Sequence, residues 1–162
     1  TNDKDELAFY RILDLLPRIG SIYANNIVSA LMNEGISLQT DFPDKLVLNA
    51  NRQFFRDILQ NLIDNSVKAM AKSEQKVIRC SYEVQNDMLE ILVSDTGIGI
   101  PQEDNEQIFA LYYTTTELQG GAGVGLYIVK TRVQSLGGSV AVVDSEFGEI
   151  GTTIKITIPF KK

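Results

Sequence analysis

The sequence predicts an α+β fold, a two-layer sandwich in which helices cover one face of a mixed, mostly antiparallel sheet. Apolar residues recur at helical spacing in much of the first half of the chain, whereas from residue 77 onward they alternate with the period of two that is typical of strands. The chain has 162 residues, of which 44% are hydrophobic, so it is long enough to bury one core. It contains no apolar run of transmembrane length.

Each expected element follows from these patterns and from local stop signals. Pro17 separates the first two helices, Gly35 ends the second, and Asn51 is a suitable N-cap for the third. Asn86-Asp87 marks a hairpin turn between two alternating strands. In chain order, we expect helices at 5–16, 18–33, 52–72 and 124–136, and strands at 36–40, 45–49, 77–84, 88–94, 139–144 and 152–160.

Pro17 is also the one expected boundary in the chain. We expect residues 1–17 to be the end of an upstream helix or a linker, and residues 18–162 to form one domain. Because the chain begins at Thr1 and not at a methionine, we also expect it to be a piece of a longer protein.

Composition excludes several classes of function. The chain has no histidine, so it cannot use a histidine general base, a Ser-His-Asp or Cys-His nucleophile, or an HExxH zinc site. Its net charge of −6 argues against nucleic acid as the main partner. Its single cysteine excludes an intrachain disulfide and points to a reducing compartment. Any chemistry must therefore use carboxylates, amides, hydroxyls, lysines, backbone groups or a bound ligand.

The helix expected at 52–72 carries a polar stripe beside its apolar face. Asn61, Asn65 and Lys68 are four and three residues apart, so they stack along one side of the helix. An ordinary solvated face is the simplest alternative, but such a face more often carries Glu, Lys or Gln, because asparagine is a poor helix former. An amide oxygen suits Mg²⁺ and a lysine suits phosphate oxygens, so the stripe is a candidate site for both.

A glycine-rich turn, DTGIGIP at 95–101, directly follows a strand. Gly97 and Gly99 allow the backbone to turn sharply and to approach a ligand closely. Asp95 places a carboxylate at the turn, where it can accept a hydrogen bond from an exocyclic amine. A plain Asp-Gly turn is the alternative, and an aspartic protease would need a second matching motif, which the sequence lacks.

Two further glycine segments lie towards the C-terminus. GGAGVGL at 120–126 opens a helix, where backbone N–H groups and the helix dipole favour an anion, yet it matches neither the Walker nor the Rossmann pattern. Gly151-Thr152-Thr153 enters the last strand and, taken alone, is an ordinary β-turn. Each segment by itself is a weak signal.

Together and in this order, the segments resemble the ATP-binding domain of sensor histidine kinases, a family within the larger group of gyrase-type, mismatch-repair and chaperone ATPases. The similar stretches cover roughly residues 20–162. NLIDNSVKA at 61–69 is similar to the N box, DTGIGIP at 95–101 to the G1 box, IFALYYTT at 108–115 to the F box, GAGVGL at 121–126 to the G2 box, and GTT at 151–153 to the final glycine motif.

The resemblance implies a Bergerat-type ATP-binding fold that holds ATP and Mg²⁺ under a lid. By this likeness Asn65 would ligate Mg²⁺, Asn61 and Lys68 would contact the phosphates in catalysis, and Asp95 would accept the adenine amino group. Phe109, Tyr112 and Tyr113 would pack the near end of the lid onto the body. The residues implied to bind the nucleotide are Asn61, Asn65, Lys68, Asp95, Gly97, Gly99, Thr115, Gly121, Gly123, Val124, Gly125, Leu126 and Thr152.

Asn61 favours one branch of this group. In the related ATPases a glutamate that activates water occupies the matching position, and an amide cannot serve as a general base. This favours an enzyme that passes its γ-phosphate to another nucleophile. Two departures concern the lid: the segment from Thr116 to Gly120 is short, and Thr116 stands where many family members carry a lysine.

The resemblance implies a histidine kinase catalytic domain of a two-component system, acting in the cytoplasm without binding nucleic acid or contacting a membrane directly. Its partners would be a histidine-containing dimerisation domain of the same full-length protein, with residues 1–17 as the end of that domain's helix or a linker, and a cognate response regulator. Because the chain has no histidine, the acceptor must lie elsewhere. Two alternatives stay open: a serine protein kinase like the anti-sigma-factor kinases, and a degenerate nucleotide-binding interaction module.

Overall fold

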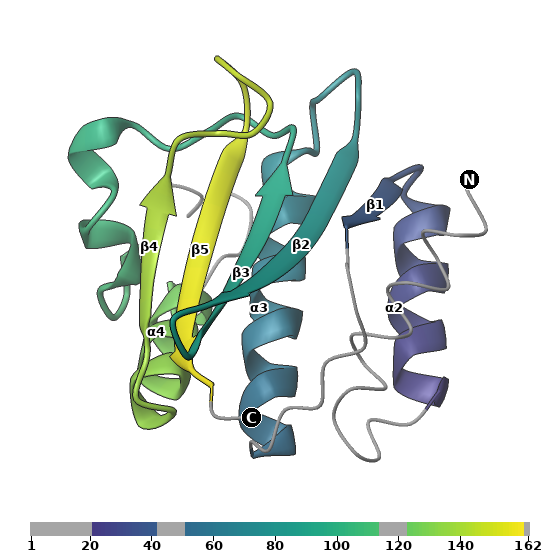
Figure 1. The fold of residues 1–162 in the computed structure, drawn as a ribbon. Coiled ribbons are helices and arrows are strands. Elements are labelled where there is room, and N and C mark those ends of the chain that lie inside the picture. Colours follow the sequence, from purple (N-terminus) through teal and green to yellow (C-terminus); the bar gives the residue numbers. More distant parts are fainter. Residues whose placement is uncertain (1–20, 42–50, 114–122, 161–162) are drawn as a thin grey trace.

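The computed structural model describes residues 21–41, 51–113 and 123–160 of the chain (Figure 1). The helix expected at 5–16, the strand expected at 45–49, and the candidate residues Thr115 and Gly121 lie outside these described residues.

The described part contains a five-stranded sheet with the strand order β1-β2-β3-β5-β4. Its strands are β1 (Ser37–Asp41), β2 (Val77–Gln85), β3 (Met88–Asp95), β4 (Ser139–Val143) and β5 (Thr152–Pro159). β1 pairs with β2 in parallel, and every other neighbouring pair is antiparallel. The predicted hairpin joins β2 and β3 through Asn86 and Asp87, which have φ angles of 50° and 59°, as a tight hairpin turn requires.

Three helices cover one face of the sheet (Figure 1). They are α2 (Ser21–Asn33), α3 (Arg52–Ala69) and α4 (Gly125–Ser135), and two short 3-10 turns, η1 (Gln102–Asp104) and η2 (Gln107–Phe109), follow β3. This arrangement confirms the predicted α+β sandwich with a mixed, mostly antiparallel sheet. No helix among the described residues is long and apolar enough to cross a bilayer.

The core lies between these helices and the inner face of the sheet. α3 and α4 contribute the side chains at the spacing that the sequence predicts, and the alternating inward residues of β2, β3 and β5 complete the layer. Burying each such side chain contributes about 1.5–3 kcal/mol before conformational entropy is subtracted. The largest fully buried residues are Ile58, Leu62, Met70, Ile78, Leu89, Val129, Val133 and Ile156.

α3 begins as predicted but ends earlier. Asn51 caps it by accepting a hydrogen bond from the N–H of Phe54 at 3.1 Å. The helix was expected to reach residue 72, but it ends at Ala69, because the carbonyl of Ala69 accepts the N–H of Ile98 at 3.1 Å. The N–H of Ile98, in the loop after β3, thus replaces the N–H that the next helical turn would supply. The same hydrogen bond holds that loop against the end of α3.

An ion pair between helices fixes α4 on α3. Arg132 Nε lies 3.1 Å from Asp57 Oδ2, and the Arg132 guanidinium stacks over the ring of Phe54 at 4.5 Å. Both charged side chains are partly exposed, so the pair contributes only about 0.2–1 kcal/mol. The pair joins the last turn of α4 to α3 at Asp57, one turn before Asn61 of the polar stripe.

Candidate functional site

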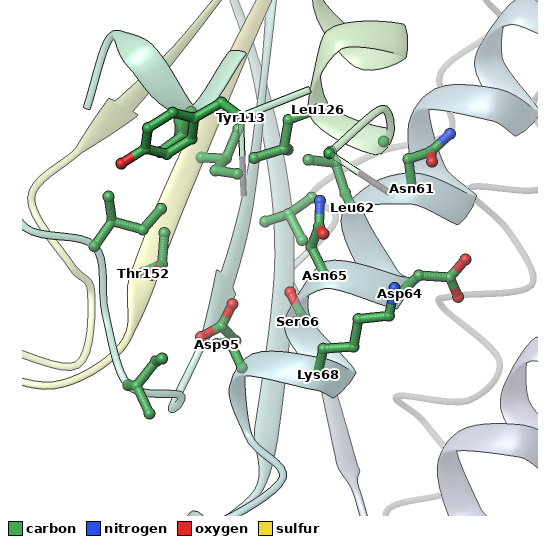
Figure 2. A pocket seen from close by; sticks show the side chains of 18 of the residues that line it. Asn61, Leu62, Asp64, Asn65, Ser66, Lys68, Asp95, Tyr113, Leu126 and Thr152 are labelled. Carbon is green, nitrogen blue, oxygen red and sulfur yellow. The ribbon is translucent and has the colours of Figure 1, made fainter. Parts of the chain in front are cut away.

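A cavity of about 420 Å³ opens between α3, the loop after β3, the N-terminus of α4 and the start of β5 (Figure 2). Gly97 does not line it: a Cβ at this position would lie 2.6 Å from the Cβ of Ala69, so Gly97 packs against α3 instead. The other sequence-predicted residues in the described part all line the cavity: Asn61, Asn65, Lys68, Asp95, Gly99, Gly123, Val124, Gly125, Leu126 and Thr152.

Asp95 supplies a buried carboxylate at one end of the cavity, where β3 ends. The residue is only 5% exposed, and its Oδ1 accepts the N–H of Gly97 at 2.9 Å. Burial raises the pKa of Asp95, while hydrogen bonds from the Gly97 N–H, the Ser66 hydroxyl and the Thr152 N–H act to lower the pKa. These donors hold the carboxylate in one orientation facing the cavity.

Ser66 is a site residue that the sequence interpretation missed. It is 4% exposed, and Figure 2 shows its hydroxyl beside Asp95. One signal was available: Ser66 lies four residues after Leu62, on the apolar side of α3, where a buried hydroxyl needs a partner.

The raised pKa of Asp95 gives the stability of the protein a specific pH dependence. In the window between the ordinary Asp pKa of 3.8 and the raised native pKa, the native state binds more protons than the unfolded chain, so the Asp95 contribution falls as the pH rises through the window. We therefore expect wild type to gain stability relative to Asp95→Asn as the pH falls towards 3.8. Urea unfolding of both proteins at several pH values measures this, and a constant difference would contradict it.

Apolar side chains surround Asp95 at this end of the cavity. In the register of β3 and β5, the Asp95–Thr152 pair adjoins the Val93–Ile154 pair on the same face. Ile100 and Ile108 also line the cavity here, and the sequence interpretation did not single them out. The result is an apolar slot with one carboxylate at its edge, a chemistry that suits a planar base with an exocyclic amine.

The polar stripe of α3 forms the other end of the cavity. Asn61 Nδ2 donates to the carbonyl of Asp57 at 2.7 Å, which leaves Asn61 Oδ1 facing α4, 3.0 Å from where a Cβ of Gly125 would lie. Asn65 Nδ2 is buried and has no hydrogen-bond partner among the described residues. Leaving such a group unpaired costs about 1–3 kcal/mol, so this end of the site fits a ligand that pairs with the amide.

α4 starts directly at this polar end. It has no side-chain cap at its N-terminus, in contrast to α3, so its first N–H groups are not satisfied by a capping side chain. Lys68 also lines the cavity, is exposed, and carries a positive charge. An anion at this position would meet the positive end of the helix dipole and a lysine.

The rim of the cavity is held by a backbone contact between Tyr112 and Gly123. The N–H of Tyr112 donates to the carbonyl of Gly123 at 2.8 Å. Gly123 has φ +65°, and a Cβ there would lie 2.6 Å from the Tyr112 carbonyl carbon, so only glycine fits. The chain positions on either side of residues 114–122 therefore meet at one point of the rim.

The three aromatic residues before position 114 differ in how they are buried. Phe109 is buried and packs on the body, and Tyr113 lines the cavity near Thr152 (Figure 2). A hydrogen bond to Asp104 raises the pKa of Tyr113. Tyr112, expected to pack like the others, is 73% exposed, because its φ of 64°, which brings its N–H to Gly123, turns the ring outward.

The helix–sheet sandwich holds one cavity, with an apolar slot at one end and the polar stripe of α3 at the other. This arrangement is that of a nucleotide-binding ATPase. The chain belongs to the family of histidine kinase-, DNA gyrase B- and HSP90-like ATPases, whose sequence profile matches residues 50–162.

Its curated relatives are sensor kinases. Aerobic respiration control sensor protein ArcB of Escherichia coli K12 is 37% identical over 121 residues, which cover 72% of this chain and 15% of that protein. Signal transduction histidine-protein kinase ArlS of Staphylococcus haemolyticus is 38% identical over 115 residues, covering 68% and 24%. Sensor histidine kinase WalK of Bacillus subtilis is 34% identical over 127 residues, covering 75% and 20%. The chain thus spans a quarter or less of the length of these relatives.

Solved structures share the fold. The catalytic domain of histidine kinase ThkA superposes with a TM-score of 0.71 at 21% identity, covering 97% of this chain and 91% of that domain. Full-length ShkA in complex with AMPPNP superposes with a TM-score of 0.68 at 25% identity, covering 85% of this chain and 29% of that protein.

Proposed function

We propose that this domain binds Mg-ATP in the cavity and supplies the γ-phosphate to a histidine outside this chain, as the catalytic domain of a sensor histidine kinase. One observation carries the proposal: a buried carboxylate and an unpartnered buried amide, Asp95 and Asn65, face the two ends of a single cavity of about 420 Å³. The sensor kinases among its relatives support the same assignment.

Asp95 recognises the base. Its carboxylate can only accept hydrogen bonds when ionised, so it selects a base that presents an amino group, as adenine does. The donors from Gly97, Ser66 and Thr152 act to lower the pKa of Asp95 and so oppose the effect of burial, which raises it. The apolar residues beside it, with Gly99 and Thr152, enclose the ring.

The phosphates occupy the polar end. The N-terminus of α4 presents backbone N–H groups to them, and Lys68 supplies positive charge. Asn65 offers an amide whose oxygen is a hard, neutral ligand of the kind that Mg²⁺ prefers, while its unpaired Nδ2 would donate to a phosphate oxygen. When bound, Mg²⁺ supplies neutralisation of the negative charge on the phosphates.

The residues around the phosphates favour transfer over hydrolysis. Among the described residues that line the cavity, the carboxylates are Asp64 and Asp95. Asp64 accepts a hydrogen bond from Gln60 Nε2 at 2.8 Å, and Asp95 is engaged with its own donors at the base end. Asn61, at the phosphate end, cannot remove a proton from water. The phosphate is thereby kept for a protein nucleophile.

The acceptor and the further partners belong to the same proposal. The chain has no histidine, so a phosphoacceptor histidine would lie on a dimerisation domain of the full-length protein, in the cytoplasm, and a response regulator would receive the phosphate from it. Residues 1–17 are the proposed connection to that domain.

Nucleotide binding and phosphotransfer are tested in two steps. Mg-ATP at a concentration of 100 Kd should stabilise the chain by about 2.7 kcal/mol, which differential scanning fluorimetry detects as a higher Tm. Mixing the chain with a dimerisation segment of its full-length protein and radiolabelled ATP should then give acid-labile, base-stable label on that segment. No Tm shift at millimolar nucleotide would contradict binding, and acid-stable label would assign a serine acceptor instead.

Asn65→Ala tests whether the unpaired amide lowers the stability of the free protein and contributes to Mg-ATP binding. We expect the variant to bind Mg-ATP about tenfold more weakly while the free protein keeps or gains stability, because an unpaired buried amide is removed. Calorimetry with Mg²⁺ and with EDTA measures the first effect and urea unfolding the second. Gln53→Ala, on the exposed first turn of α3, is the matched control. Unchanged Mg-ATP affinity would remove Asn65 from the site.

A further inference from the structure

Asp95 and Thr152, which face the cavity, each have a neighbour that faces the opposite side of the sheet. β3 and β5 pair Asp95 with Thr152 and, one step along, Ser94 with Thr153. Since successive side chains of a strand alternate between faces, Ser94 and Thr153 lie directly behind the base-recognition pair. Both are 0% exposed, although no helix covers that face in the described part of the chain.

The connection between β4 and β5 covers these two hydroxyls. It lies at the same end of the sheet as the end of β3 (Figure 1). Ser94 Oγ donates to Glu146 Oε2 at 2.6 Å, Thr153 Oγ1 donates to Ser94 Oγ at 2.9 Å, and the N–H of Glu146 donates to Thr153 Oγ1 at 3.0 Å. Each hydroxyl both donates and accepts, so these residues, here called the outer-face network, form a closed ring.

The same connection then leads into β5, whose first residue, Thr152, lines the cavity. Phe147 packs under the guanidinium of Arg79 on β2, with 4.6 Å between the guanidinium carbon and the ring centre. Further along, the N–H of Gly151 donates to the carbonyl of Gly97 at 3.1 Å, and Thr152 enters β5 with its N–H towards Asp95. The connection is thus anchored twice, at Glu146 on the outer face and at Gly151 on the loop after β3, and Thr152 follows directly from the second anchor.

We propose that Glu146, Ser94 and Thr153 are positioning residues that determine the base specificity of this domain, by fixing Asp95 and Thr152 from behind. The inference rests on the proposed function, in which Asp95 accepts the amino group of the base. Ser94 and Asp95 share a peptide unit, as do Thr152 and Thr153, so a shift on the outer face moves the groups that read the base. The Glu146 carboxylate accepts a charge-assisted bond from the buried Ser94 hydroxyl, and the Glu146 N–H donates to the buried Thr153 hydroxyl, so both contacts are directional and suited to this role.

The test compares ATP with inosine triphosphate, which carries a carbonyl where adenine carries the amino group. In the 162-residue chain, Thr153→Val keeps the side-chain shape and removes the hydroxyl at the centre of the ring. We expect its ATP affinity to fall about five- to tenfold while its inosine triphosphate affinity is unchanged. The ratio of ATP affinity to inosine triphosphate affinity then falls by the same factor. A purely structural role would weaken the binding of both nucleotides alike.

Two substitutions of Glu146, one disruptive and one conservative, test the network, and a substitution of Glu90 on β3 is the control. Glu146→Ala removes the acceptor for Ser94 and should narrow the ATP preference, whereas Glu146→Gln keeps an acceptor oxygen and should retain most of it. Because Glu146 lies on an exposed connection, these variants report on the network even if Thr153→Val does not fold. Glu90→Gln breaks the 3.5 Å pair with Lys155 on the outer face of the same two strands and should leave the preference unchanged.

Asp95→Asn, measured beside these variants, separates the two hypotheses. If Asp95→Asn loses ATP affinity but Glu146→Ala keeps the wild-type ratio of ATP to inosine triphosphate affinity, the positioning role of the outer-face network is wrong and the proposed function stands. If Asp95→Asn binds ATP like wild type, the proposed function itself is wrong, and the inference falls with it.

Discussion

Replacing Asp95 by asparagine is expected to weaken Mg-ATP binding by about 1.5–3 kcal/mol, roughly a tenfold to hundredfold loss of affinity. Asp95 is 5% exposed and its carboxylate is held by donors from Gly97, Ser66 and Thr152, so in the proposed function it would meet the base in one fixed orientation. An asparagine there places an NH₂ group either against these donors or against the adenine amino group, and both arrangements lose a hydrogen bond.

Isothermal calorimetry at neutral pH measures the loss, and Asp87→Asn is its matched control. Asp87 lies in the hairpin turn at the far end of β3, where its φ of 59° suits asparagine equally well. The control should bind Mg-ATP like wild type. Equal affinity of Asp95→Asn and wild type would show that the base is recognised elsewhere.

Gly151→Ala is expected to cause the largest loss of stability, more than about 3 kcal/mol. Gly151 has φ +78°, and a Cβ there would overlap the carbonyl oxygen of Asp95, so the start of β5 would have to move away from the end of β3. The clash is with backbone on both sides, which leaves no flexible side chain to yield. Loss of the Asp95–Thr152 pairing would remove nucleotide binding as well.

Gly148→Ala shows how much of that effect comes from the backbone angle alone. Gly148 has φ +79°, nearly the same value, but nothing lies within 4 Å of a Cβ placed there. This variant should lose only about 1 kcal/mol. Urea unfolding of both variants measures the difference. Similar losses in the two would show that strain at positive φ, and not contact with Asp95, makes glycine necessary at position 151.

Much of the fold could be predicted because local signals and tertiary packing agree. The Asn51 cap and the Asn86-Asp87 turn each act through backbone groups a few residues away, and the structure has both. The end of α3 was predicted wrongly, at residue 72 instead of Ala69, because the partner of its last carbonyl comes from Ile98, distant in the sequence. Periodicity within a helix carries no information about such a partner.

The candidate site divides in the same way. Asp95 and the asparagines of α3 stand in motifs whose spacing is visible in the chain, and the structure brings them to one cavity. Ser66 and Glu146 gain their importance from pairing across elements, Ser66 with Asp95 and Glu146 with Ser94. That pairing depends on the register of the strands and on how α3 packs against the sheet, and neither can be derived from a single sequence.

The contact between Tyr112 and Gly123 fixes the rim of the site through backbone atoms alone. It holds two chain positions that are eleven residues apart in the sequence at one point beside the cavity. Any residue that adopts a positive φ can therefore replace Tyr112 without loss of this contact, whereas Gly123 has no substitute, because a Cβ there would overlap the Tyr112 backbone.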